Sequence, residues 1–170
     1  IAPMLKELGA TIRHPDRYVL VTDHYVPAVD EESRAIVQFT RDWVKKTGLR
    51  NFHDNEGICH VVLPEKGYVR PGMFIVGGDS HSPTGGAFGA YMLGVGATEM
   101  LGVLVTGQIW LKVPETILIE WTGTFAAGVS SKDVMLFLCG RFGMNGGQYQ
   151  AVEFTGDAIA ALSLQERMTL

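Results

Sequence analysis

The sequence of 170 residues lacks several features that mark particular classes of protein. It contains no uncharged apolar stretch of about 18 residues, so it predicts no membrane-spanning helix. It has no basic cluster, and its net charge of −4 argues against nucleic acid as a partner. Internal repeats and low-complexity tracts are also missing. With 46% hydrophobic and 19% charged residues, the chain is expected to be globular.

Cysteine is scarce, with only Cys59 and Cys139 in the sequence. The two residues lie far apart in apolar surroundings, so we expect reduced, buried core thiols and no disulfide framework. No secretory signal peptide is recognisable either. Together these features predict a cytoplasmic protein.

Both ends of the sequence predict helices that are incomplete. Ser163 and Glu166 have the spacing of a capping box, which predicts that a helix begins shortly before Leu170. At the other end, residues 1–9 are typical of the last turns of a helix that ends at Gly9. We therefore expect residues 1–170 to form a single α/β domain, a truncated piece of a larger multidomain protein.

Between the ends, strand-like and helix-like segments alternate. Short runs rich in β-branched residues predict strands at residues 17–23, 58–63, 73–79 and 115–123. Amphipathic or apolar segments predict helices at residues 30–46, 86–107 and 130–138, the second of them buried. The alternation predicts a layered α/β/α domain with a mostly parallel sheet.

Polar residues follow two of the predicted strands directly. Asp23 and His24 end the first strand, and Asp79-Ser80-His81 ends the third. Ligands of open α/β sheets bind beyond the carboxyl ends of the strands, so these residues are candidates for a pocket. A third histidine, His60, lies within the predicted strand 58–63, whereas His14 and His53 lie in polar connections and are expected at the surface.

Three chemistries compete for these residues. The strand followed by "GDS" resembles the nucleophile block of GDSL-type esterases, but no histidine follows His81 to serve as the base. A mononuclear metal site could use His24, His60, Asp79 and His81, although no compact spacing such as H-x-x-x-H is present. A dinucleotide site is disfavoured because no strand leads into G-x-G-x-x-G.

Four segments, taken together and in order, resemble the aconitase superfamily. They are "VTDHYVPA", "GICHVVLPEKGYVRPGMFIVGGDSHSPTGGAFGAYMLGVGATEM", "TGQIWLKVPET" and "GVSSKDVM". The similarity is greatest to the branch of 3-isopropylmalate dehydratase large subunits and homoaconitase-like proteins. It extends from about residue 17 to Leu170 and implies an aconitase iron–sulfur-type domain.

The resemblance implies a hydro-lyase that moves water across a carbon–carbon bond of a hydroxy di- or tricarboxylic acid. The implied cofactor is a [4Fe–4S] cluster that acts as a Lewis acid. Its three cysteine ligands are expected downstream of Leu170, so no metal ligand is expected in this chain. The implied partner is a swivelling domain or small subunit that supplies a serine base. Alone, the chain is expected to be inactive.

The resemblance also assigns roles to individual residues. His24, held by Asp23, corresponds to a proton donor, since an aspartate partner fixes the imidazole tautomer and favours its protonated form. The residues expected around the iron-bound water and the substrate are His60, Asp79 and His81. Ser80 and Thr84 correspond to substrate contacts. The pair Gly77-Gly78 departs from the more common Gly-Thr and leaves the branch open.

Several alternatives therefore stay open. Within the superfamily, the parent could be an aconitase, a homoaconitase or a 2,3-dimethylmalate dehydratase instead of an enzyme of leucine biosynthesis. In another class, the chain could be a stand-alone module that binds small acids or metals unaided.

Overall fold

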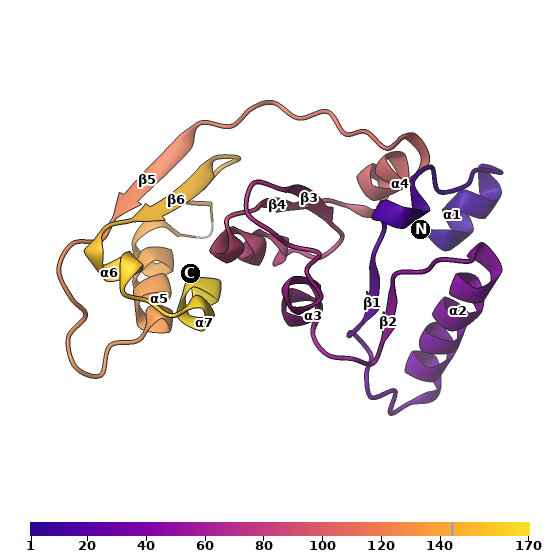
Figure 1. Ribbon diagram of the computed structural model, residues 1–170, viewed down its shortest axis with the longest axis horizontal. Coiled ribbons are helices and arrows are strands. Elements are labelled where there is room, and N and C mark those ends of the chain that lie inside the picture. Colours follow the sequence, from indigo (N-terminus) through magenta and orange to yellow (C-terminus); the bar gives the residue numbers. More distant parts are fainter. Residues whose placement is uncertain (144) are drawn as a thin grey trace. The chain divides into compact units, whose positions relative to one another are not determined.

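The computed structural model of the chain describes residues 1–143 and 145–170. These residues form two compact units. Unit 1 consists of Ile1–Gly85 and Gly89–Ile109, and unit 2 of Gly86–Phe88 and Trp110–Leu170. The expectation of one domain stays a prediction, and each unit is described by itself (Figure 1).

The first half of unit 1 is a β–α–β unit that follows a short helix. Its elements are α1 (Ala2–Glu7), the 3₁₀ helix η1 (Pro15–Arg17), β1 (Leu20–Thr22), α2 (Glu31–Thr47) and β2 (Phe52–Asp54). Strands β1 and β2 pair in parallel, with Leu20 opposite Phe52 and Thr22 opposite Asp54. The crossover through α2 brings the carboxyl ends of both strands to the same edge.

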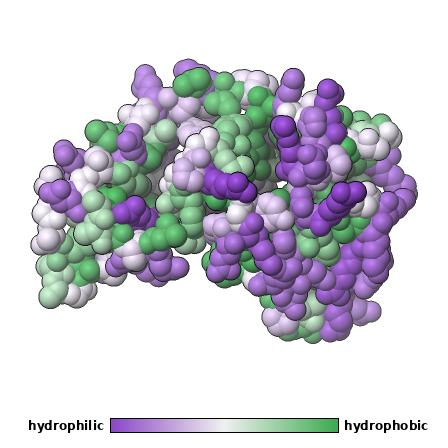
Figure 2. Space-filling model, viewed as in Figure 1, coloured by the Kyte–Doolittle hydropathy of each residue, from purple (hydrophilic) through white to green (hydrophobic). Residues whose placement is uncertain are grey.

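The limits of α2 follow from its local sequence. Asp30 accepts a hydrogen bond from the Ser33 backbone N–H, and the Ser33 hydroxyl closes a capping box. At the other end Gly48 takes the left-handed conformation, with φ of 68°, in which a side chain would be strained. The predicted helix is confirmed, and Figure 2 shows hydrophilic residues gathered over it.

The second half of unit 1 corrects two predictions. It contains α3 (Cys59–Glu65), β3 (Phe74–Gly77), the first residues of the 3₁₀ helix η2 (Ser82–Phe88), β4 (Tyr91–Gly94) and α4 (Ala97–Thr106). Residues 58–63 are thus not a strand, although their β-branched residues favour one. A short apolar run does not distinguish a strand from a helix, and only Val62 of the run is fully buried, as on one face of a helix.

The prediction of one buried helix over residues 86–107 is also wrong. Gly89 has φ of 73°, which ends the 3₁₀ helix, and the chain then pairs as β4 in parallel with β3. Only the part from Ala97 to Thr106 is α-helical, and it ends at Gly107 in the left-handed conformation. Apolar periodicity alone did not reveal this break, because strand β4 is defined by its long-range partner.

Unit 2 is a second β–α–β unit with two further short helices. It contains β5 (Thr116–Glu120), α5 (Ser131–Phe142), β6 (Ala151–Thr155), α6 (Asp157–Ala160) and α7 (Leu164–Thr169). Strands β5 and β6 pair in parallel. The predicted capping box of Ser163 with Glu166 is confirmed, and Ser130 forms a second one with Asp133 at the start of the predicted helix 130–138.

All strand pairs among residues 1–143 and 145–170 are parallel, which confirms the α/β class. The pairs form three two-stranded sheets, however, and within the described residues they do not join into one continuous sheet. The principal core of unit 1 lies between α1 and α4, where Leu5 packs with Met100, Leu101 and Leu104.

The cysteines only partly match their prediction. Both thiols are free, and Cys59 is half-buried, but Cys139 is exposed and is no core residue. Its prediction as a buried thiol was wrong because α5 buries the neighbouring Leu138, at 8% exposed, and leaves Cys139 exposed together with Leu136 and Phe137, at 59% each. Within the described part of the chain, no helix is both long and apolar enough to cross a membrane.

Candidate active site

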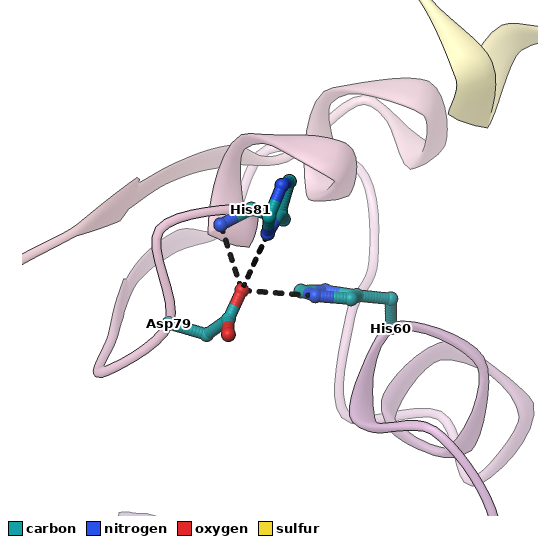
Figure 3. Close-up of side chains that lie close together, drawn as sticks. All are labelled: His60, Asp79 and His81. Carbon is teal, nitrogen blue, oxygen red and sulfur yellow. Dashed lines mark hydrogen bonds and ion pairs between the residues drawn. The ribbon is translucent and has the colours of Figure 1, made fainter. Parts of the chain in front are cut away.

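The Asp79 carboxylate is the centre of a polar cluster in unit 1. Asp79 lies in the turn that follows β3, and its Oδ1 atom accepts a hydrogen bond of 2.7 Å from the His81 backbone N–H. The same oxygen lies 3.1 Å from His60 Nε2 and 3.4 Å from His81 Nδ1 (Figure 3). Helix α3 provides His60, so residues from two segments of the chain meet at one carboxylate.

A second aspartate–histidine pair lies at the end of β1. His24 Nδ1 is 2.7 Å from Asp23 Oδ1, and the His24 backbone N–H donates to the same oxygen at 2.8 Å. The other oxygen of Asp23 accepts a 2.7 Å hydrogen bond from the Cys59 backbone N–H at the start of α3. This arrangement leaves His24 Nε2 directed toward Asp79, at 3.6 Å from its Oδ2 atom.

All five residues predicted as catalytic therefore lie together. We call them the His–Asp cluster, which consists of Asp23, His24, His60, Asp79 and His81. The structure corrects only the element that carries His60, which is a helix and not a strand. That helix begins beside Asp23, and its first turn brings His60 to Asp79.

Hydrogen bonds determine the charge states of Asp23 and His24. Burial raises the pKa of Asp23, but hydrogen bonds from Cys59 and His24 outweigh it and lower the pKa to about 2. The hydrogen bond to Asp23, and then the charge of that carboxylate, raise the pKa of His24 above its ordinary value of 6.5. His24 is therefore protonated over a wider pH range than a free histidine.

Asp79 is also held in its ionised form. The His81 backbone N–H lowers the pKa of Asp79, and the nearby His60 lowers it further against the opposing effect of burial. A stable carboxylate at this point can accept hydrogen bonds from imidazoles or from a bound water molecule.

The cluster is accessible to a ligand on its histidine side. The side chains of His24 and His81 are 68% and 80% exposed, whereas Asp23 is only 10% exposed. The buried aspartate orients the imidazole, and the exposed imidazole can reach a ligand. This is the arrangement that general acid catalysis requires.

Ser80 and Thr84 lie beside the cluster. Ser80 Oγ is 3.4 Å from His81 Nδ1, and Thr84 Oγ1 donates a 2.7 Å hydrogen bond to the His81 carbonyl. In a serine hydrolase the base binds the serine with one nitrogen and its carboxylate with the other. His81 faces both Ser80 and Asp79 with the same nitrogen, so this geometry does not support a nucleophilic serine.

The sequence did not reveal the residues that support the end of β1. Thr22 is buried, and its hydroxyl donates to Asp54 Oδ1 at 2.7 Å and accepts from the Asn55 N–H at 3.1 Å. Arg41 Nε on α2 binds the other oxygen of Asp54 at 2.7 Å. These partners are 13 to 33 residues apart in the sequence, so no local pattern indicates them.

His53 corrects another prediction, since it is not an ordinary surface residue. Its side chain is 12% exposed, its Nδ1 atom is 3.1 Å from Glu56 Oε1, and its Nε2 atom is 3.2 Å from the Tyr68 hydroxyl. Glu56 also binds Lys66 at 2.9 Å. His53 thus joins β2 to the segment after α3, while His14 is exposed as predicted.

Three residues of the cluster lie close enough together for a metal ion. One ligand atom each from His60, Asp79 and His81 lies within 4.8 Å of the others, which is close enough to hold a metal ion. The hydrogen bonds of both histidines to Asp79 account for this proximity without a metal ion.

An iron–sulfur cluster does not fit the residues of this chain. A [4Fe–4S] cluster is held by several cysteine thiolates, and the chain has only two cysteines. Burial, and then the neighbouring Asp23, raise the pKa of Cys59 to about 12, so its thiol stays protonated. Cys139 is exposed and belongs to unit 2, whereas Cys59 belongs to unit 1.

Comparison with known proteins shows extensive similarity. The 3-isopropylmalate dehydratase large subunit 1 of Methanopyrus kandleri is 44% identical over 168 residues, which make up 98% of this chain and 40% of that protein. The probable methanogen homoaconitase large subunit of Methanothermobacter thermautotrophicus is 47% identical over 162 residues, 95% of this chain and 38% of that protein. The 3-isopropylmalate dehydratase large subunit of Moorella thermoacetica is 43% identical over 168 residues, 97% of this chain and 40% of that protein.

The chain thus spans about two fifths of the length of these curated relatives. The model of the Aconitase family (aconitate hydratase) matches residues 2–170, which is nearly the whole chain. The resemblance seen in the sequence segments is confirmed, and the chain belongs to the aconitase family.

Proposed function

We propose that the chain is part of a hydro-lyase that dehydrates and rehydrates a hydroxy di- or tricarboxylic acid. The first candidate is the large subunit of 3-isopropylmalate dehydratase, an enzyme of leucine biosynthesis. Two relatives of 43% and 44% identity bear that name. Homoaconitase is the alternative within the family, because a relative of 47% identity is named as one.

The observation that carries this proposal is the orientation of His24. Its Nδ1 atom is fixed by Asp23, while its Nε2 atom points into the cluster toward Asp79. A protonated imidazole in this position can give a proton from Nε2 to the hydroxyl group that leaves the substrate. The hydrogen bond to Asp23 raises the pKa of His24, so that proton stays on the ring to higher pH than on a free histidine.

The other cluster residues receive complementary roles. Asp79 is the acceptor that orients the departing water, and His60 and His81 hold the Asp79 carboxylate between them. Ser80 is exposed beside this site and is proposed as a contact of a substrate carboxylate. Thr84 is proposed as a second contact, since its hydroxyl oxygen can accept a hydrogen bond while it donates to His81.

The complete active site would also need a cofactor and a catalytic base that residues 1–170 do not supply. As the resemblance to the aconitase family implies, a [4Fe–4S] cluster would supply a Lewis acid, and its cysteine ligands are not Cys59 or Cys139. A swivelling domain or a small subunit would supply the catalytic base and close the site. Residues 1–170 are accordingly proposed to be inactive without them.

The test uses the full-length parent with its small subunit. The complex is reconstituted with iron and sulfide and assayed with 2-isopropylmalate, homocitrate, citrate and 2,3-dimethylmalate. We expect turnover of one of these acids, with 2-isopropylmalate as the first candidate. A reconstituted complex that acts on none of them contradicts the proposal, and turnover of homocitrate alone selects the alternative.

A further inference from the structure

Ser82 lies directly behind the His–Asp cluster and is hidden from solvent. It is only 1% exposed, so its side chain has no access to a ligand. Its hydroxyl donates a 2.7 Å hydrogen bond to the backbone carbonyl of Asp79, and its backbone N–H donates to the same oxygen at 3.2 Å. Two donors of one residue thus converge on a single acceptor, which fixes the turn between Asp79 and Ser82.

The space around this contact is closed by two glycines. Gly77 and Gly94 are the last residues of β3 and β4, and they lie opposite each other in the parallel pair. A Cβ atom added to Gly94 would lie 2.5 Å from the Asp79 carbonyl oxygen. A Cβ atom added to Gly77 would collide with the Ser82 hydroxyl. The strand ends therefore leave room for this hydroxyl and for no further side chain.

The fixed carbonyl holds the backbone from which the Asp79 carboxylate projects. The carbonyl and the carboxylate belong to the same residue, and the carboxylate bonds to the His81 N–H on the same turn. Without the Ser82 hydroxyl, one of the two hydrogen bonds to the Asp79 carbonyl is lost. We expect the carboxylate then to move from its positions 3.1 Å from His60 and 3.6 Å from His24.

We propose that Ser82 is a positioning residue of the active site, which acts through Asp79 and touches neither substrate nor cofactor. This inference rests on the proposed function, because it assigns Asp79 a part in the reaction. A displacement of about 1 Å of a reacting group can cost about 100-fold in rate. Asp79 is proposed to act on the departing water and not to hold the rest of the acid, so the loss should appear in kcat.

The experiment compares two serine variants of the reconstituted full-length complex. Ser82→Ala removes the buried hydroxyl behind the cluster. Ser33→Ala is the matched control, because Ser33 is also buried, at 4% exposed, and its hydroxyl also makes a local hydrogen bond. We expect Ser82→Ala to lower kcat about 10- to 100-fold, with KM changed less than about 3-fold. Ser33→Ala should leave both constants at their original values.

Hydrogen exchange gives a readout that is independent of activity. In the Ser82→Ala complex, the backbone amides of His81 and Ser82 should exchange faster, since both donate to Asp79. The same amides should be unchanged in Ser33→Ala. Gly94→Ala is a second route to the same displacement and should reproduce the fall in kcat.

The outcomes separate this inference from the proposed function. If the original complex is inactive on all four acids, the proposed function fails, and the exchange rates alone then judge whether Ser82 holds the turn. If the original complex is active and Ser82→Ala retains its kcat, the inference is wrong although the function stands. A rise in KM alone, or a loss that matches the loss of folded protein, also overturns the inference.

Discussion

His24 Nε2 lies 3.6 Å from Asp79 Oδ2, while His24 Nδ1 lies 2.7 Å from Asp23 Oδ1. One imidazole thus joins two carboxylates from separate strand ends. Asp23 is largely buried and fixes the ring, whereas the Asp79 side faces the accessible part of the site. The two nitrogens of His24 therefore have different partners, Nδ1 the aspartate that fixes the ring and Nε2 the carboxylate on the accessible side.

Replacement of His24 by alanine should remove the proton donor. In the reconstituted parent we expect His24→Ala to lower kcat by about 10²- to 10⁴-fold, the usual contribution of general acid catalysis. Steady-state assays measure this loss, and the visible absorption of the iron–sulfur cluster shows whether the cofactor is retained. His14→Ala is the control, since His14 is exposed outside the cluster. Full turnover by His24→Ala would exclude His24 as the acid.

The pH profile of the reaction should depend on Asp23. Because Asp23 raises the pKa of His24, the protonated form persists to higher pH, and dehydration declines as pH rises through that pKa. Asp23→Asn removes the charge and should move this alkaline limb to lower pH. The profile of kcat/KM checks the shift, with Asp42→Asn on the exposed face of α2 as the control. If the alkaline limb of the kcat/KM profile lies at the same pH in Asp23→Asn as in the original protein, a group other than His24 is responsible for it.

Acid should destabilise the chain through the same aspartate. The pKa of Asp23 is about 2 in the folded chain, against an ordinary value of 3.8. A lowered carboxyl pKa adds stability that is complete above the ordinary value and is lost as pH falls toward about 2. The difference in melting temperature between the original chain and Asp23→Asn should therefore narrow between about pH 5 and pH 2. A constant difference over this range would contradict the prediction.

Thr22 should stabilise the end of β1. Thr22→Val keeps the shape of the side chain but leaves Asp54 Oδ1 and the Asn55 N–H without their buried partner. We expect the free energy of unfolding to fall by about 1–3 kcal/mol, measured by denaturant titration. Thr47→Val at the exposed end of α2 is the control and should cost less than about 0.5 kcal/mol. Equal losses in the two variants would show that the Thr22 network contributes nothing of its own.

A melting experiment distinguishes an incomplete site from a stand-alone binding module. Residues 1–170 are heated alone, with a dicarboxylic acid, and with iron or zinc. A ligand at 100 times its Kd stabilises the folded chain by about 2.7 kcal/mol, which would be a clear shift. We expect no shift with acid alone and at most a weak, unsaturable one with metal. A saturable shift with the acid would favour the binding module.

The sequence by itself determined the features that depend on neighbouring residues. The starts of α2, α5 and α7 follow from capping boxes, whose partners are three residues apart, and α2 ends at Gly48. The candidate site residues could also be predicted from the sequence. Asp23 and Asp79 directly follow apolar runs and lie in segments that resemble the aconitase superfamily. Both the helix starts and the candidate residues depend on residues close together in the sequence, so short sequence patterns are sufficient to predict them.

Only the tertiary structure decided the features that depend on distant partners. It made residues 59–65 a helix, which brings His60 to Asp79, and it made residues 91–94 a strand by pairing them with β3. It also placed Thr22 against Asp54 and Ser82 behind Asp79. Burial and strand pairing can override local preference, because their free energy comes from contacts that only the folded chain makes.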